Sequence, residues 1–61
     1  MIEADQFYTL EEVSVLLNIS LSNVIDLVQR GNILCHESKG FRRISGKDLQ
    51  QYLNNLHVTM E

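Results

Sequence analysis

All five basic residues of this 61-residue chain lie between positions 30 and 47, where their clustered positive charge can bind phosphate. They are Arg30, Lys39, Arg42, Arg43 and Lys47. The flanking segments are acidic, so residues 1–29, 30–47 and 48–61 carry formal charges of -5, +4 and -2. The total of -3 conceals this basic segment, and it does not exclude nucleic acid as a partner.

A group of polar side chains at the start of an expected helix can read DNA bases. Ser22 and Asn23 fall in its first turn, and this end of a recognition helix points at base edges. An Asn side chain bonds adenine through two hydrogen bonds, and Ser reaches either base type. Ser20, just before the helix, can hold a phosphate together with the free N–H groups there. The alternative is that Ser20 and Asn23 only cap the helix.

Catalytic chemistry has little support in the sequence. Cys35 and His36 are adjacent in an expected strand, where neighbouring side chains face opposite ways and form neither a nucleophile–base pair nor a chelate. A single cysteine excludes an internal disulfide and a multi-cysteine zinc site. The chain has no glycine-rich phosphate loop. We expect no enzymatic activity, metal, cofactor or small-molecule ligand.

Two consecutive helices must position the polar group. The sequence Thr9-Leu-Glu-Glu12 is a capping box that opens a helix predicted over 10–17. Asn18 tolerates the left-handed conformation that ends such a helix, and Ser20 caps the next, predicted over 21–30. Two helices joined by so short a turn indicate a helix-turn-helix.

A hairpin and a third helix follow. Short strands are predicted within 33–37 and 41–44, joined by a turn at 38–40, so that a wing of about 33–44 carries most of the basic residues. Ser45 caps the last helix, and Gly46 in its first turn is a mild cost to helix stability. The fold class is mainly α with a small β-hairpin wing, a winged helix-turn-helix.

The apolar residues divide into a predicted core and a possible contact patch. The four aromatic residues are interpreted as core and wing-root packing and not as a platform for stacking bases; they are Phe7, Tyr8, Phe41 and Tyr52. Val15, Leu21 and Ile25 fall on the outer sides of the first two helices and together form a candidate protein-contact patch.

The length of the chain allows one small domain. We expect a flexible acidic N-terminus at 1–6, the winged domain at 7–57 and a tail at 58–61. No apolar run reaches the ~20 residues of a membrane span, and we expect a cytoplasmic protein with no membrane partner.

An ordered set of short motifs resembles the excisionase-type DNA-binding domain, a short relative of the MerR-like winged helix-turn-helix. The set comprises Tyr8-Thr-Leu-Glu-Glu-Val13, Leu16-Leu17, Ile19-Ser20, Val24, Leu27-Val28, Arg30-Gly31, Arg42-Arg43-Ile44 and Asp48-Leu49-x-x-Tyr52-Leu53. The resemblance implies that the second helix enters the major groove of double-stranded DNA and that the wing contacts the backbone or minor groove. Members of this family are small DNA-binding proteins of phages, plasmids and chromosomes; some direct site-specific recombination and others regulate transcription, so the resemblance implies a phage or mobile-element role as one possibility.

The chain departs from the family pattern on the second helix, where members commonly carry basic residues at the positions of Leu21 and Asp26. A single copy should therefore bind DNA weakly and depend on self-association or on a partner protein already on the DNA. The alternative function is a protein-binding module of the same fold that modulates a polymerase, recombinase or chaperone partner. A third reading is the DNA-binding part of a packaging or partition complex.

Overall fold

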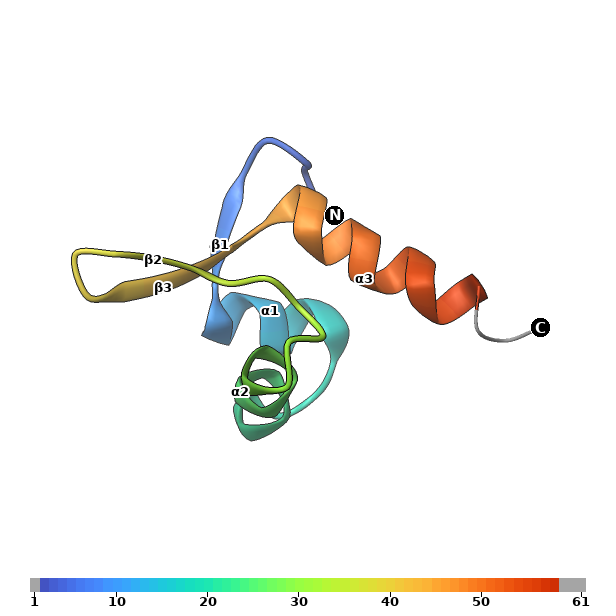
Figure 1. Ribbon diagram of the computed structural model, residues 1–61, viewed down its shortest axis with the longest axis horizontal. Helices are drawn as coiled ribbons and strands as arrows, with labels where there is room; N and C mark the ends of the chain where they lie inside the picture. The colour runs from blue at the N-terminus through green and yellow to red at the C-terminus, as the bar shows by residue number, and fades with distance from the viewer. Residues whose placement is uncertain (1, 59–61) are drawn as a thin grey trace.

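Three helices and a three-stranded antiparallel sheet make up the computed structural model, which describes residues 2–58 (Figure 1). In chain order they are β1 (Phe7–Thr9), α1 (Leu10–Leu17), α2 (Leu21–Gln29), β2 (His36–Ser38), β3 (Phe41–Ser45) and α3 (Gly46–Val58). The predicted fold class is confirmed: a helix-turn-helix is followed by a hairpin wing and a third helix. Figure 1 shows the β2–β3 hairpin and α3 extending to opposite sides of the α1–α2 pair.

The predicted caps set the limits of the first two helices. The Thr9 hydroxyl accepts from the Glu12 backbone N–H at 3.1 Å, and the Glu12 carboxylate accepts from the Thr9 N–H at 2.9 Å. Asn18 ends α1 in the left-handed conformation, with φ 58°. Ser20 then caps α2 by accepting from the Asn23 N–H at 3.1 Å. Side chains and one left-handed residue thereby satisfy backbone groups that the helix ends leave without partners.

The wing turns at Lys39 and Gly40, both with positive φ, as a two-residue hairpin loop of type I′ requires. His36, Glu37 and Ser38 of β2 pair with Arg43, Arg42 and Phe41 of β3. The expected turn is confirmed, but the first strand begins later than predicted, because residues 33–35 lie outside the sheet.

The sheet has a strand that the sequence analysis missed. β1 pairs with the other edge of β3, with Phe7 opposite Ser45, Tyr8 opposite Ile44 and Thr9 opposite Arg43. The strand order is therefore β1-β3-β2, and β3 lies in the centre. The wing is thus anchored to the segment that leads directly into α1.

Five fully buried side chains form the core: Val13, Val24, Ile33, Ile44 and Leu49. They come from α1, α2, the loop before β2, β3 and α3, so every layer of the domain contributes one. Ile33 is apolar because it is buried in the core, although it lies in the loop before β2 and not in the predicted strand.

The N-terminal segment lies against the start of α3. The Gln50 amide donates to the Ile2 carbonyl at 3.1 Å, the Tyr8 hydroxyl accepts from the Glu3 N–H at 2.7 Å, and Ile2 packs on the core. A Cβ atom on Gly46 would overlap the Glu3 carbonyl. The expected boundaries of the flexible N-terminus and of the tail remain predictions, and residues 59–61 lie outside the described part of the chain.

Candidate nucleic-acid interface

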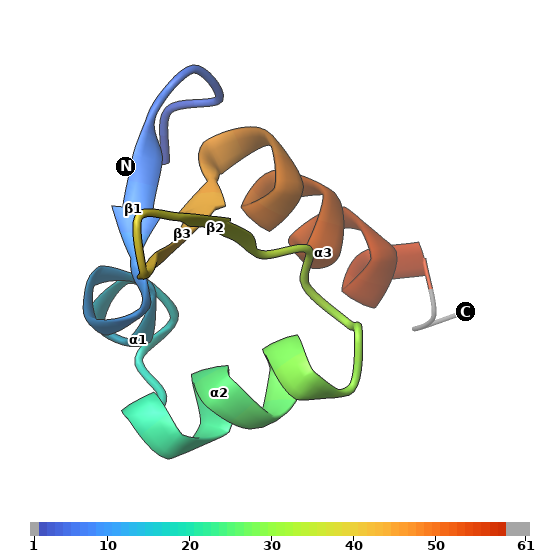
Figure 2. The ribbon, with the colours of Figure 1, turned by 60° about the vertical axis from the view of Figure 1, so that its left-hand side comes forward.

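A groove between the start of α2 and the end of the wing is the feature that brings the predicted site together. Leu21 and Ile25 of α2 line one side, and Gly40, Phe41, Arg42 and Arg43 line the other. Thr9, Leu10 and Glu11, at the start of α1, also line it. We call this concavity of about 340 Å³ the α2–wing groove. Figure 2 shows the bend of the wing and the first turn of α2 on the same side of the molecule.

The predicted base-reading residues lie at the end of α2 that adjoins this groove. Ser22 and Asn23 are exposed side chains in the first turn, directly after Leu21 of the groove wall. The Ser20 hydroxyl uses an acceptor site for the cap, and a hydroxyl also carries a donor. Capping and phosphate binding by Ser20 are therefore compatible, and the roles of all three residues stay predictions.

Three of the five basic residues belong to the wing itself. Lys39 is at its turn, and Arg42 and Arg43 follow on β3, all exposed. Because Arg43 pairs with Thr9 and His36 while Arg42 pairs with Glu37, the two arginines project from opposite faces of the sheet. Among the residues that the structure describes, none of these three basic side chains forms a salt bridge. Their charge is therefore available to a phosphate.

The other two basic residues lie apart from the wing. Arg30 caps the far end of α2, where its guanidinium Nε lies 2.9 Å from the Asp26 carboxylate. Lys47 is in the first turn of α3, at the opposite end of β3 from the wing turn. The Arg30–Asp26 pair was missed in the sequence, although their spacing of four residues is the usual signal of a helical ion pair. This pair offsets the only positive charge in or beside α2.

The residues of the candidate apolar patch line two hollows. Leu21 and Ile25 line the α2–wing groove, whereas Val15 lines a separate hollow with Tyr8, Glu12 and Leu16. Val15 is nevertheless the most exposed large apolar side chain of the described region, at 79%. The three residues thus line two different hollows, and a protein contact by Val15, Leu21 or Ile25 remains a prediction.

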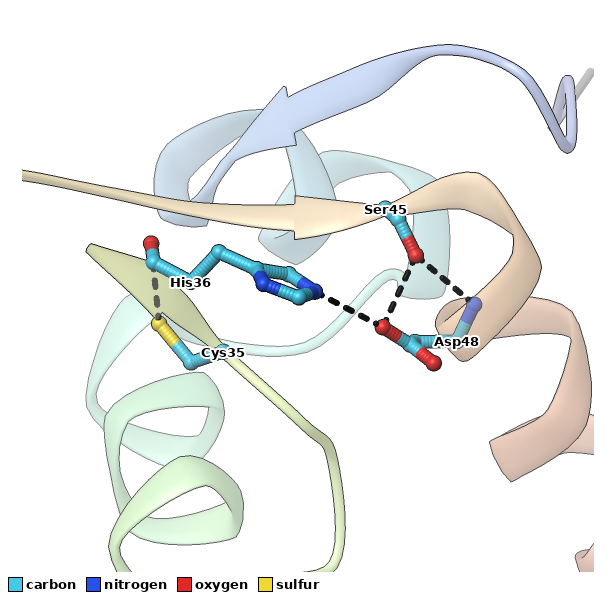
Figure 3. A network of polar contacts seen from close by, with 4 residues as sticks. All are labelled: Cys35, His36, Ser45 and Asp48. Atoms are coloured by element: carbon cyan, nitrogen blue, oxygen red, sulfur yellow. Dashed lines mark hydrogen bonds and ion pairs between the residues drawn. The ribbon is translucent and has the colours of Figure 1, made fainter. Parts of the chain in front are cut away.

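A polar network joins the wing to the start of α3 (Figure 3). The Asp48 carboxylate oxygen Oδ2 accepts from the Ser45 hydroxyl at 2.8 Å and lies 3.2 Å from Nε2 of His36. The Ser45 hydroxyl in turn accepts from the Asp48 N–H at 3.0 Å, so it caps α3 as predicted. Because the carboxylate lies between the serine and the histidine, His36 does not contact the hydroxyl that a catalytic histidine would activate. The network holds β2 against α3.

Two of the four aromatic residues contradict their predicted role. Tyr8 and Tyr52 pack against the core, but Phe7 is 57% exposed and Phe41 66% exposed. Both lie on the face of the sheet that is turned away from the buried side chain of Ile44, since the register places Phe7 beside Ser45 and Phe41 beside Ser38. The exposure of Phe7 follows from the pairing of β1 with β3, and a three-residue strand has no local sequence signal that would predict this register.

Comparison with known proteins agrees with this architecture. The family model for a helix-turn-helix domain, of the excisionase-like type, matches residues 7–57. The chain is also similar to an uncharacterized protein of Bacillus subtilis (strain 168), YvgK, with 35% identity over 52 residues. The match covers 85% of this chain and 17% of that protein, so the chain spans about a sixth of its relative's length. No solved structure matches the chain. No helix within residues 2–58 is long and apolar enough to cross a bilayer.

Proposed function

The chain belongs to the excisionase-like helix-turn-helix domain family, and from this premise we propose that it binds double-stranded DNA through α2 and the wing together. The observation that carries the proposal is the α2–wing groove, in which Leu21 and Ile25 near the start of α2 face Arg42 and Arg43 of β3. In this arrangement Ser22 and Asn23 face base edges in the major groove, and Lys39, Arg42 and Arg43 contact the phosphate backbone.

The proposed contacts have a definite limit in strength. If all five basic residues touched phosphate, the slope of log affinity against log salt would be at most about -4.5. Arg30 is engaged by Asp26, Lys47 is remote from the groove, and the Glu11 carboxylate in the groove repels phosphate. A single copy therefore binds weakly, and we propose that stable occupancy needs adjacent copies or a partner protein on the DNA. The protein acts by binding in the cytoplasm, as an accessory factor in recombination or a transcription regulator, and not by catalysis.

An NMR titration of the labelled chain with duplex DNA at low salt tests this function. We expect backbone amide shifts to concentrate in the first turn of α2 and at residues 39–43, because Leu21 and residues 40–43 line the groove and Lys39 is the exposed base at the wing turn. The C-terminal half of α3 serves as the internal control, because α3 begins at the end of β3 that is farthest from the wing turn. An absence of shifts at low salt would contradict the proposal.

A second candidate function, binding to a protein, is favoured by one observation. The wall that α2 contributes to the groove is apolar, with Leu21 37% exposed and Ile25 half-buried. The basic residue nearest to it in sequence, Arg30 at the end of α2, forms an ion pair with Asp26. Such a surface suits an apolar side chain of a partner better than a phosphate. In the same NMR titration, this function is selected if the amide signals of the groove residues do not shift with duplex DNA but shift with a partner protein.

Replacing Asp26 with asparagine provides a gain-of-binding test. Asp26→Asn removes the acid that holds Arg30 at 2.9 Å, so the guanidinium can turn to a phosphate. We expect duplex affinity to rise by roughly threefold to tenfold, with a salt slope steeper by up to about 1. Fluorescence anisotropy over a salt series measures both quantities.

The matched control for this variant is Asp5→Asn, which makes the same charge change away from α2. We expect the control to raise affinity less and to leave the salt slope unchanged. Equal gains in the two variants would mean that only net charge matters and that Arg30 gains no phosphate contact.

A further inference from the structure

The outer face of the sheet exposes two aromatic side chains, Phe7 and Phe41. Their exposure needs an explanation, because a chain of 61 residues buries little apolar surface and gains stability from each aromatic ring in its core. Phe7 on β1 and Phe41 on β3 are 57% and 66% exposed, although aromatic side chains contribute the most to burial in a small protein. Phe7 does not belong to the α2–wing groove, so duplex binding there does not explain its exposure.

The register of the sheet places these rings around one hollow. Phe7, His36, Ser38, Lys39, Phe41 and Arg43 line a concavity of about 510 Å³. The Phe7 and His36 rings meet edge to face, with centroids 5.8 Å apart and planes at 83°. His36 is held from behind by Asp48, as Figure 3 shows, so this part of the hollow is already ordered. We call these six residues the outer sheet site.

The charge of the outer sheet site favours an anionic occupant. Lys39 and Arg43 line it, neither forms a salt bridge within residues 2–58, and no acidic residue lines it. Glu37, the only acid on β2, projects to the other face, since it pairs with Arg42. An occupant that brings flat apolar surface together with negative charge is complementary to this arrangement.

We propose that the outer sheet site binds single-stranded nucleic acid, with unpaired bases stacked on Phe7 and Phe41 and phosphates held by Lys39 and Arg43. Single-strand sites in other proteins combine these same parts, aromatic rings that stack bases of any sequence and basic side chains along the backbone. Aromatic residues and arginine also occur at protein interfaces, so the feature that favours a polyanion over a protein is the pair of basic side chains without salt-bridge partners among residues 2–58. The inference does not rest on the proposed duplex function. Phe41 and Arg43 line both sites, but Phe7 and His36 line the outer sheet site and not the α2–wing groove.

Replacing Phe7 with leucine tests the site, because leucine keeps the apolar character of the strand position and removes the ring. We expect the wild-type chain to bind a short oligothymidylate, and Phe7→Leu to bind it roughly fivefold to a hundredfold more weakly. Phe41→Leu should weaken binding over a similar range. NMR titration measures affinity, and upfield ring-current shifts of the phenylalanine ring protons report stacking itself. Oligouridylate in parallel shows whether DNA or RNA binds more tightly.

Leu34→Ala is the matched control, since Leu34 is 61% exposed and lies outside the outer sheet site. It should leave oligothymidylate binding unchanged, and Phe7→Leu should leave duplex binding unchanged, so the two proposals fail separately. Methyl signals of Val24 and Ile44 in their native positions verify that each variant is folded. The proposal is overturned if neither oligonucleotide shifts the ring protons, or if Phe7→Leu abolishes concentration-dependent self-association without affecting nucleic acid.

Discussion

Replacing both Arg42 and Arg43 with alanine is expected to lower duplex affinity by roughly a hundredfold or more, because each contact of a charged group contributes ~1.5–3 kcal/mol. The salt slope should become shallower by about 1.8, since two phosphate contacts are lost. Both side chains are exposed and form no salt bridge among the described residues, so the variant should melt at the wild-type temperature. Fluorescence anisotropy with labelled duplex, repeated over a salt series, measures affinity and slope together.

The control for this variant keeps the charge and changes the geometry. Arg42→Lys with Arg43→Lys should retain the salt slope while losing part of the affinity, because lysine cannot form the two-pronged contact that a guanidinium makes with phosphate. The wing assignment would be wrong if the alanine variant bound duplex with unchanged affinity and slope. It would also be wrong if the lysine variant lost the slope, since that loss cannot come from charge.

The local signals in the sequence predicted the helix-turn-helix well. The capping box at Thr9 and Glu12, the left-handed Asn18 and the Ser20 cap all occur as expected. So does the hairpin turn, where positive φ at Lys39 and Gly40 gives a sharp reversal. Each of these features depends on residues within four positions of one another, and this is the range over which side-chain chemistry determines the backbone.

The missed strand shows where such reasoning stops. Phe7–Thr9 is only three residues long and has no turn of its own, so nothing local distinguishes it from a disordered end. It is a strand because the free edge of β3 lies beside it, 34 to 38 residues later along the chain. Long-range pairing of this kind overrides local propensity. The register it creates is what places Phe7 on the outer face.

Only part of the candidate site could be predicted, because its other part also depends on contacts between residues far apart in the sequence. The basic residues of the wing follow from the hairpin, and the polar start of α2 follows from the Ser20 cap. The groove between them depends on how α2 packs against the wing through the core, and no residue spacing encodes that angle. That Val15 lines a different hollow from Leu21 and Ile25 is also an outcome of packing.

At Gly46, helix propensity and tertiary packing predict opposite effects of a substitution by alanine. It is the first residue of α3, and by helix propensity alone alanine there should stabilise the domain by up to ~1 kcal/mol. In the structure Gly46 is buried, and its N–H donates to the Gln6 carbonyl at 2.8 Å. An added Cβ would overlap the Glu3 carbonyl and also press on the backbone of Ala4. Neither obstacle is the end of a flexible side chain, so the backbone itself would have to move.

We therefore expect Gly46→Ala to destabilise the domain by ~1–3 kcal/mol, the usual cost of overfilling a packed site, which lowers the melting temperature of so small a domain by about 4–24 °C. Thermal unfolding followed by circular dichroism measures the change. Repeating the substitution in a chain that lacks residues 1–4 isolates the cause, because without the Glu3 carbonyl the alanine should become neutral or stabilising. An alanine that stabilises the full chain would show that the N-terminal segment does not pack on α3.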